Sequence, residues 1–407
     1  MTQTTLLPVP EAIRIVQTQT ARLEPEQIAL ASARGRVLAA DVIADSDLPP
    51  FDRALMDGYA VRAQDTTDVP VRLRIVGEAA AGRGWRGVLQ AGEAVRIMTG
   101  APVPIGADSV QQVEVTRELE GGAAVEIDKP TQHGQFITRR ATEIKRGEIV
   151  LRAGTAINAA MMAALASFGY ARVRVGTRPR VAVLATGTEL VAVDEQPGPD
   201  QIRDSNTYSL LAYAEAAGAI VEHLPFAGDD AELLQRLIAE AAARTDALIL
   251  SGGVSMGVYD FTKTALGALG AEVFFERVSL RPGKPTVFAR LGRTLVFGLP
   301  GNPVSVSVTF NLFARTALRA MQGAQDAALV AEQAVLGRAV KGALERASYL
   351  PARLHTDDDG RLIAEPLRWG GSSDFVAFTQ ATALVLIAAG VQAVDAGAVV
   401  RVLRLPE

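Results

Sequence analysis

In its second half, the chain alternates continuous apolar runs with segments of helical pattern, and no other feature constrains the fold as tightly. Apolar runs fill residues 181–185 and 247–250, and residues 231–242 between them are amphipathic, with their leucines on one helical face. Strands that are apolar throughout are buried on both faces, as in a mainly parallel sheet covered by helices. The alternation predicts a central α/β domain over residues 177–326.

The segments on either side of this domain predict smaller modules. Short β-rich runs split by Gly and Pro are typical of a small all-β module. Residues 1–44 and 141–176, which are separated in the sequence, together indicate a helical linker domain whose first helix packs on the central domain. Short strands near the C-terminus indicate a β-barrel or sandwich. The predicted boundaries are 45–140 for the inserted β domain, 1–44 with 141–176 for the linker domain, and 327–407 for the C-terminal β domain.

Three helices are expected at definite positions in the sequence. Residues 11–40 read as helical, with a start at Pro25, and residues 155–169 read as a helix with Thr155 as its N-cap. One long helix is expected from Val304 to Met321, after a loop that two prolines stiffen.

The composition excludes several kinds of chemistry. The chain has 407 residues with no cysteine and 3 histidines, so disulfides, thiolate nucleophiles, iron–sulfur clusters and thiolate zinc sites are absent. Any metal chemistry must use oxygen ligands or a ligand that the substrate brings. The net charge of −4, from 41 basic and 45 acidic residues, also speaks against a general nucleic-acid binder.

The sequence predicts a cytoplasmic protein that does not enter a membrane. The N-terminus lacks the basic region and long apolar run of a signal peptide. The longest apolar stretch near the C-terminus, residues 383–391, is far shorter than the roughly 20 residues that a membrane span needs.

Three loops rich in Gly, Ser, Thr and Pro follow the expected central strands, at residues 186–189, 251–257 and 298–305. Ligands bind outside the carboxyl ends of the strands in such sheets. The glycines and serines of the second loop expose backbone N–H groups that suit an anion. Asp260, at the start of the next helix, is either an N-cap or a group beside the bound anion, where Mg²⁺ would relieve the repulsion.

Other charged segments leave two readings open. Arg281 and Lys284 lie in a rigid Pro/Gly frame, which favours an oxyanion site over a solvated loop. Asp229 and Asp230 precede a helix, where an N-cap is the plain alternative to a ligand role. The irregular segment 49–60 is either a structural strap or a carrier of acids into a neighbouring cleft. The residues alone indicate an α/β enzyme that acts on an anionic, phosphorylated ligand.

Together, these motifs resemble the molybdopterin molybdenumtransferases, the molybdenum insertases of molybdenum-cofactor biosynthesis. The matching strings run in the family's order and span most of the chain: LPPFDRALMDGYAVR (48–62), GEAVRIMTGAPVPIGADSV (92–110), VAVLATGTEL (181–190), IRDSNTYSL (202–210), LILSGGVSMGVYDFTK (248–263), RPGKPTVFA (281–289) and VFGLPGNPVSVSVTF (296–310). The last 80 or so residues match weakly by string but fit the family's terminal β domain.

The resemblance implies a four-domain subunit with a central domain of the molybdopterin-binding type and an elongated homodimer with the active site between the central domain and the partner. The implied reaction inserts molybdate into adenylylated molybdopterin and releases AMP, with Mg²⁺ as helper. Contact with molybdopterin adenylyltransferase and with proteins of molybdoenzyme maturation is also implied, and neither nucleic acid nor membrane is an expected partner.

The resemblance also assigns roles to residues at the matching positions. The catalytic group comprises Asp57, Glu189, Asp229 and Asp260, of which Glu189, Asp229 and Asp260 would hold Mg²⁺. The substrate-binding group comprises Thr99, Thr188, Gly252, Gly253, Ser255, Arg277, Arg281, Lys284, Pro300, Pro303, Arg353 and Ser372. In this second group, Arg281, Lys284, Arg353 and Ser372 would bind molybdate. Where the family commonly has Asp, this chain has Glu143, which would stand in for it.

Three alternatives to the insertase remain at this level. The related molybdopterin adenylyltransferase shares the central α/β module, but a bare module would need only about 150–190 residues. A scaffold on the same fold would carry a long linker and a second fused module. A non-catalytic pterin carrier would not need all the acids. The sequence leaves open whether molybdate or tungstate is used, since the two oxyanions share shape and charge.

Overall fold

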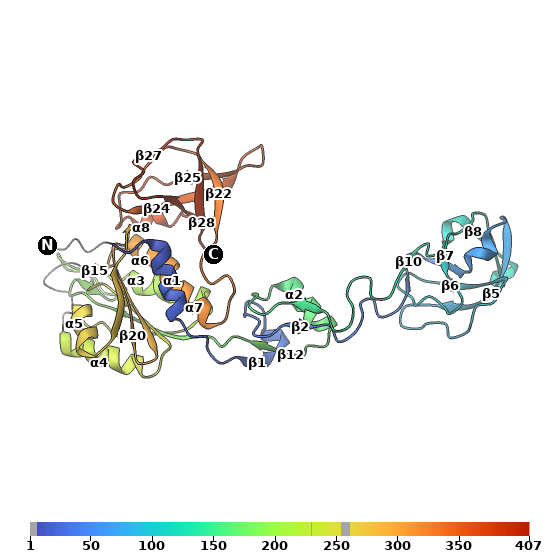
Figure 1. The fold of residues 1–407 in the computed structure, drawn as a ribbon, viewed down its shortest axis with the longest axis horizontal. Helices are drawn as coiled ribbons and strands as arrows, with labels where there is room; N and C mark the ends of the chain where they lie inside the picture. The colour runs from blue at the N-terminus through green and yellow to red at the C-terminus, as the bar shows by residue number, and fades with distance from the viewer. Residues whose placement is uncertain (1–5, 229, 254–260, 407) are drawn as a thin grey trace. The chain divides into compact units, whose positions relative to one another are not determined.

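The computed structural model describes residues 6–228, 230–253 and 261–406, which form two compact units (Figure 1). Unit 1 comprises residues 1–40, 153–162 and 172–407, and unit 2 comprises residues 41–152 and 163–171. Among the described residues, no helix is both long and apolar enough to cross a membrane.

A six-stranded sheet forms the centre of unit 1, in the order β16-β13-β17-β21-β20-β18. Its first four strands are parallel, and β20 and β18 continue the sheet antiparallel. The bounds are β13 Arg180–Ala185, β16 Ile220–His223, β17 Ala247–Ser251, β18 Glu272–Arg277, β20 Pro285–Leu291 and β21 Thr294–Leu299. The predicted multi-domain α/β fold with a mainly parallel central sheet is confirmed.

Helices cover both faces of this sheet (Figure 1). The side chains of each strand alternate between the two faces, so each strand contributes to two cores. Val181 and Val183 of β13 belong to one core, and Ala182 and Leu184 belong to the other. The first core is covered by α1 Val9–Gln19, α3 Asn206–Ala216, α6 Pro303–Thr309 and α7 Arg315–Met321, and the second by α4 Ala231–Ala242 and α5 Phe261–Ala268. Both faces are buried, which explains the apolar strand sequences.

A closed five-stranded barrel forms the C-terminal part of unit 1, through the ring of pairings β24-β25-β22-β28-β26-β24. Its strands are β22 Ala331–Leu336, β24 Ala347–Thr356, β25 Leu362–Pro366, β26 Ala383–Ile387 and β28 Val399–Arg404, with β23 Val340–Lys341, β27 Ala393–Val394 and α8 Phe375–Phe378 beside them. The two-residue strand β19, Leu280–Arg281, pairs in parallel with the start of β24. The predicted C-terminal barrel is confirmed.

Unit 2 is built on a six-stranded sheet in the order β7-β4-β6-β5-β9-β8. Its strands are β4 Gly58–Val61, β5 Val71–Ala79, β6 Glu93–Ile97, β7 Ser109–Gln112, β8 Thr116–Leu119 and β9 Ala124–Ile127. Two short pairs form separate two-stranded sheets: β2 Val42–Ile43 with β11 Ile149–Leu151, and β3 Arg53–Ala54 with β10 Ile137–Thr138. Strands β5, β6, β7 and β9 lie where the short β-rich runs predicted strands.

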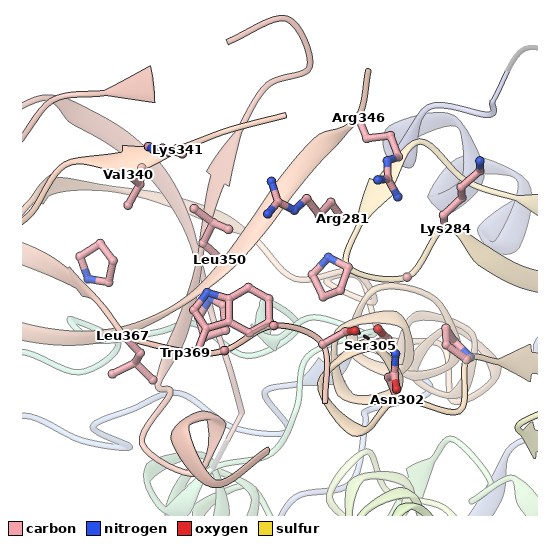
Figure 2. Close-up of a pocket in the computed structure, with 18 of the residues that line it drawn as sticks. Arg281, Lys284, Asn302, Ser305, Val340, Lys341, Arg346, Leu350, Leu367 and Trp369 are labelled. Carbon is pink, nitrogen blue, oxygen red and sulfur yellow. Dashed lines mark hydrogen bonds between the residues drawn. The ribbon is translucent and has the colours of Figure 1, made fainter. Parts of the chain in front are cut away.

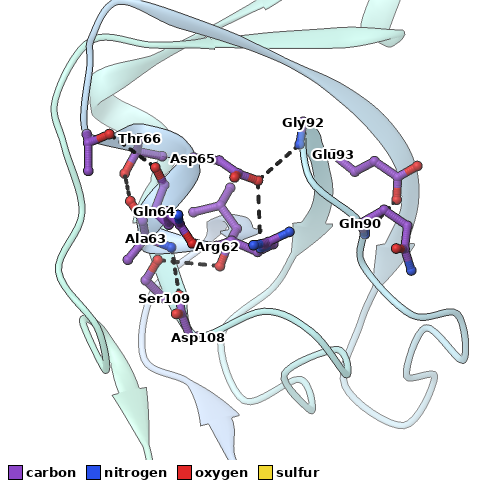
Figure 3. A network of polar contacts seen from close by, with 12 residues as sticks. Arg62, Ala63, Gln64, Asp65, Thr66, Gln90, Gly92, Glu93, Asp108 and Ser109 are labelled. Atoms are coloured by element: carbon purple, nitrogen blue, oxygen red, sulfur yellow. Dashed lines mark hydrogen bonds and ion pairs between the residues drawn. The ribbon is translucent and has the colours of Figure 1, made fainter.

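Buried hydroxyls and two carboxylates fix the short helical turn Ala63–Thr66 of unit 2 (Figure 3). Asp108 accepts a hydrogen bond from the Ala63 N–H at 2.7 Å, and Asp65 accepts one from the Gly92 N–H at 3.0 Å. The Thr66 and Thr131 hydroxyls lie 2.9 Å apart. These hydrogen bonds satisfy the polar groups of the turn and attach it to the neighbouring segments of unit 2.

Three helix predictions need correction. The helix expected over residues 11–40 ends at Gln19, and β1 Glu26–Ala29 follows it because this segment pairs with β12 Arg172–Val175. The second helix, α2, spans Ala159–Ser167, and Asn158 rather than Thr155 accepts the hydrogen bond from the Met161 N–H at 2.9 Å.

The third correction concerns the long helix expected from Val304 to Met321. A π-helical segment, Phe310–Ala314, interrupts it, and all five of its side chains are buried.

The division into four domains, with boundaries at residues 44, 140, 176 and 326, stays a prediction.

Candidate active site

The carboxyl ends of β13, β17 and β21 open into a cavity of about 930 Å³, here called the loop pocket. It is lined by the loops 186–189, 251–253 and 300–303 and by residues 201–206. A Cβ on Gly252, which has a φ of +91°, would lie 2.4 Å from the Thr186 carbonyl oxygen. Only glycine allows the two loops to approach so closely.

Asn206, the first residue of α3, joins two of these loops. Its Nδ2 donates hydrogen bonds to Ser251 Oγ at 3.0 Å and to the Gly301 carbonyl at 2.6 Å. Asp204 is buried beside it and accepts a hydrogen bond from the Thr207 N–H at 3.1 Å, as expected of an N-terminal capping carboxylate. The start of α3 thus fixes the spacing of the loops.

A second cavity of about 730 Å³, here called the basic pocket, lies between the 281–285 loop and the barrel (Figure 2). Five of its lining residues are basic, and none of its lining residues is acidic: Arg281, Lys284, Arg338, Lys341 and Arg346. The first two come from the central domain and the other three from the barrel. A cavity of this charge suits an anion, and guanidinium and ammonium groups bind oxyanions through charge-assisted hydrogen bonds.

Most of these cations have no acidic partner within the described ranges. Lys284, Lys341 and Arg346 form no salt bridge there. Arg338 is the one cation of the five with an acidic partner in those ranges, and its Nε lies 3.8 Å from Glu365 Oε1. Arg281 has one long hydrogen bond of 3.5 Å, to the Gly342 carbonyl. The pocket therefore carries positive charge that an incoming anion would neutralise.

Strand pairing brings the 281–285 loop to the barrel. Arg281 of β19 lies in register with Ser348 of β24. The turn that follows is tight, because Gly283 has a φ of +114° and a Cβ there would lie 2.5 Å from Thr309 Cγ2. Thr286 Oγ1 donates to the Gly283 carbonyl at 2.8 Å and closes the turn.

The two pockets are neighbours and share part of their lining. Pro285, Pro300 and Asn302 line both cavities. Asn302 Nδ2 donates to Ser372 Oγ at 2.8 Å, which ties the 300–303 loop to the barrel segment 370–373. A ligand in the loop pocket would thus lie next to an anion in the basic pocket.

The structure brings together most of the predicted site residues of unit 1. Thr188, Glu189, Gly252, Gly253, Pro300 and Pro303 line the loop pocket, and Arg281, Lys284, Pro300 and Ser372 line the basic pocket. Arg277 on β18 and Arg353 on β24 are exposed, and neither belongs to the lining of these two cavities. Asp229, Ser255 and Asp260 lie outside the described residues.

The predicted site residues of unit 2 form a pair of their own. Both the backbone N–H and the hydroxyl of Thr99 donate to Asp57 Oδ1, each at 2.7 Å. These hydrogen bonds hold the pKa of the exposed Asp57 carboxyl below its usual value. Glu143, the expected substitute for an Asp, pairs with Arg53 at 3.2 Å.

The oxygen donors at the loop pocket are of the kind that Mg²⁺ prefers. Glu189 contributes an exposed carboxylate. This carboxylate packs against Gly187, where an added Cβ would lie only 2.3 Å from Glu189 Oε2. Within the described part of the chain, no three His, Cys, Asp or Glu side chains are grouped for a metal ion. Glu189 is thus the described member of the predicted Mg²⁺ set, and the chemistry of its carboxylate fits that ion.

Sequence reasoning missed the three cations that the barrel contributes: Arg338, Lys341 and Arg346. The segment GRAVKGALERAS (337–348) is conspicuously basic, and this was the available signal. Its position opposite the 281–285 loop depends on closure of the barrel and on the β19–β24 pairing, which local patterns do not report.

Family models cover nearly the whole chain. Residues 7–169 match the MoeA N-terminal region (domain I and II), residues 182–320 match a "Probable molybdopterin binding domain", and residues 333–405 match the MoeA C-terminal region (domain IV). The order of the three matches follows the order of the segments described above.

Individual proteins resemble the chain over its full length. A molybdopterin molybdenumtransferase of Bacillus subtilis (strain 168) is 35% identical, with 99% of this chain and 95% of the relative aligned. A protein of the same name from Staphylococcus aureus (strain COL) is 33% identical, with 96% of this chain and 94% of the relative aligned. The crystal structure of a molybdopterin biosynthesis protein MoeA from Pyrococcus horikoshii is 32% identical, with a TM-score of 0.82 and coverage of 98% and 99%.

Proposed function

This chain belongs to the molybdopterin molybdenumtransferase family, and from that membership we propose how its two pockets divide the reaction. It is a transferase of molybdenum-cofactor biosynthesis that inserts molybdenum into molybdopterin. We propose that the substrates are molybdate and adenylylated molybdopterin, and that insertion releases AMP. The observation that carries the proposal is the continuity of the five-cation pocket with the glycine-rich loop pocket.

Molybdate would bind in the basic pocket. Lys284 and Arg346 are without acidic partners in the described ranges, and Arg281 is held beside them by β19. Ser372 offers a hydroxyl to the same anion. A dianion gains charge-assisted hydrogen bonds from such groups, and the pocket loses its internal repulsion when the anion enters. Roles for Arg277 and Arg353 stay predictions.

The adenylylated pterin would bind in the loop pocket. The backbone N–H of Gly253 and the side chain of Thr188 would hold the pterin and its phosphate, since glycine loops can present N–H groups to anions. The N–H of Gly252 donates instead to the Leu299 carbonyl at 3.2 Å, so Gly252 would contribute by its close packing against Thr186. Pro300 and Pro303 keep the third loop rigid. Because the pockets share lining residues, the reacting groups would be held side by side, which replaces a bimolecular encounter by a local one.

Mg²⁺ is part of the proposal on the chemistry of the donors. Glu189 would hold the ion, together with Asp229 and Asp260 beyond the described ranges. When bound, the ion would neutralise the phosphoanhydride and ease its hydrolysis. The acids of the chain would also orient the attacking water.

The wider setting is likewise proposed from the family. The enzyme would act in the cytoplasm as a homodimer, in which Asp57 of one subunit reaches the cleft of its partner. It would exchange its substrate and product with molybdopterin adenylyltransferase and with proteins of molybdoenzyme maturation. Small molecules, rather than nucleic acid or membrane, would be its ligands.

The deciding experiment supplies the protein with adenylylated molybdopterin, Mg²⁺ and either molybdate or tungstate. We expect AMP release and metal incorporation together, and the two oxyanion arms report the metal preference. Lys284→Ala should raise the molybdate concentration needed for half-maximal release by about tenfold, the effect of losing a good charge-assisted contact. Lys129→Ala, which removes an exposed lysine of unit 2, is the matched control.

Two results would contradict the proposal. Consumption of ATP with molybdopterin, without AMP release from the adenylylated form, would identify an adenylyltransferase. Equal molybdate dependence of Lys284→Ala and Lys129→Ala would remove the basic pocket from the oxyanion step. No observation on the chain favours the scaffold or carrier alternatives.

A further inference from the structure

Two arginines of α7 lie half-buried without an acidic partner. Arg315 and Arg319 are one helical turn apart, and each is only partly exposed. Among the described residues, neither forms a salt bridge with an Asp or Glu side chain. Arginine is rarely buried unless it is paired with an acid, so two such side chains on one helix need an explanation.

The two positive charges oppose each other. Burial lowers the pKa of both guanidinium groups, and the charge of Arg319 lowers the pKa of Arg315 further, to about 10. Like charges four residues apart also destabilise a helix. Both groups stay charged at neutral pH. This part of unit 1 therefore holds two positive charges that no acid of the described ranges compensates.

Most of the N–H donors of the pair have no protein partner in the described part of the chain. A guanidinium group has five such donors. Arg315 donates one hydrogen bond there, from Nη1 to the Ala327 carbonyl at 3.1 Å. Arg319 Nε is buried and has no partner among these residues. A buried donor of this kind indicates a bound water or ion, and the positive charge favours an anion.

The position of the pair also favours a small ion. An arginine in the last turn of a helix offsets the carbonyl end of that helix, which accounts for Arg319 but not for Arg315, the first residue of α7. Ala327 is buried and belongs to segment 322–330, which connects α7 to β22 (Figure 1). Arg315 is thus turned towards the protein's own connecting segment, where a small ion can enter more readily than the surface of another protein.

We propose that Arg315 and Arg319 together bind an inorganic oxyanion of the phosphate class, at a site separate from the loop pocket and the basic pocket. Neither arginine lines those two cavities. Guanidinium groups match the oxygens of such an anion and bind them through paired, charge-assisted hydrogen bonds. The anion would neutralise the pair and, through Arg315 and Ala327, steady the connection to the barrel. The inference does not depend on the proposed reaction.

Titration calorimetry with inorganic phosphate, at an ionic strength held constant with chloride, tests the site. Arg319→Met removes the guanidinium but keeps an unbranched side chain, and it should raise the phosphate dissociation constant by about tenfold or more, the effect of losing hydrogen bonds to a charged group. Arg315→Met should act in the same direction. Arg236→Met removes an exposed arginine of α4 and is the matched control, with a change of less than about twofold.

Phosphate would also enter the basic pocket, so the variants are made both in the parent and in Lys284→Ala. The loss caused by Arg319→Met should be the same in the two backgrounds, because distant sites act independently. Phosphate should raise the unfolding temperature of the Lys284→Ala protein, since a ligand of the folded state stabilises it. Adding Arg319→Met should remove most of this rise.

Two further measurements separate an anion site from a structural role. Arg319→Lys keeps the charge but not the planar fork, and its phosphate affinity should lie between those of the parent and Arg319→Met. In chloride alone, Arg319→Met should unfold at or above the temperature of the parent, because the charge that it removes repels Arg315. Circular dichroism checks that each variant folds.

Four outcomes would overturn the inference. The first two are an unchanged phosphate affinity in both methionine variants and an equal effect of chloride at the same ionic strength. The third is a loss of stability in Arg319→Met that is the same with and without phosphate, which would leave only a role at the helix end. The fourth is weaker self-association of Arg319→Met without phosphate binding by the parent, which would assign the pair to a carboxylate of a second copy. Failure of the proposed insertion reaction would leave all these results unchanged.

Discussion

The carboxylate of Asp57 is held by two donors from a single residue. The N–H and hydroxyl of Thr99 both point at Oδ1, and each lies 2.7 Å from it. Hydrogen bonds to the charged form lower the pKa of a carboxyl, so Asp57 stays ionised below the pH at which a free carboxyl would protonate. If Asp57 serves a cleft as an anion, as proposed, these hydrogen bonds keep it in that form.

Thr99→Val removes the hydroxyl donor and leaves the backbone N–H. The pKa of Asp57 should then rise towards its usual value. Because the folded-state pKa is lowered, the stabilisation is present above the ordinary carboxyl pKa and is lost as the pH falls through the lowered one. The acid limb of AMP release should accordingly move to higher pH. Carboxyl NMR titration measures the shift, and Thr99→Ser, which keeps the hydroxyl, should titrate like the parent. An unshifted pKa in Thr99→Val would assign the effect to the N–H alone.

Individual site residues were predictable where a motif carries them. Lys284, Glu189 and Gly252 sit in strings that the family shares, and the structure places them at the two pockets. Arg346 and Lys341 were not predictable, because they face the same cavity only after the barrel has closed.

Helix α4 shows how an element can be fixed by its first residue. Asp230 is its N-cap, and the carboxylate accepts a hydrogen bond from the Leu233 N–H at 2.9 Å. The capping alternative considered from the sequence is therefore confirmed for Asp230. A capped α4 packs Leu234 and Ile238 into the second core, together with Leu184 and Leu248 of the central strands.

Asp230→Ala should lower the free energy of unfolding by about 1 kcal/mol, within the 0.5–2 kcal/mol typical of lost N-caps. Asp230→Asn keeps an acceptor oxygen and should lose far less. Urea unfolding of the two variants measures the difference. Equal destabilisation by Ala and Asn would show that charge at the helix terminus, rather than the hydrogen bond, stabilises α4.

At the level of elements, local patterns succeeded where burial is two-sided and failed where partners are distant. β13 and β17 are apolar throughout because helices cover both faces, so their pattern is unambiguous. The segment Glu26–Ala29 is a strand only because Arg172–Val175 pairs with it. The antiparallel strands likewise depend on distant pairing, β20 with β21 and β18 with β20, which no local pattern encodes.

Proposed site residues are distributed over both units of the molecule. Asp57 and Thr99 belong to unit 2, and the two pockets belong to unit 1. A homodimer in which each cleft receives Asp57 from its partner would satisfy both facts. The arrangement can be tested without any further structure, by combining two inactive chains.

Asp57→Ala and Glu189→Ala subunits, each expected to be inactive alone, should regain activity when mixed and allowed to exchange. In a mixed dimer, one cleft combines an intact Glu189 with the partner's intact Asp57, and the other carries both defects. Random exchange should restore about one quarter of the normal AMP release. No restoration, with mixed dimers verified by mass spectrometry of tagged chains, would show that Asp57 acts within its own chain or not at all.

The pairing of β19 with β24 has a consequence for how such an enzyme can diverge. The loop carrying Arg281 and Lys284 is aligned by the barrel, and the barrel supplies three of the five cations. The glycine loops, in contrast, belong wholly to the central sheet. If the two pockets act as proposed, preference among oxyanions would depend largely on the barrel, and recognition of the pterin would depend mainly on the loops of the central sheet. Changes in the C-terminal barrel would then alter the oxyanion preference while leaving the glycine loops as they are.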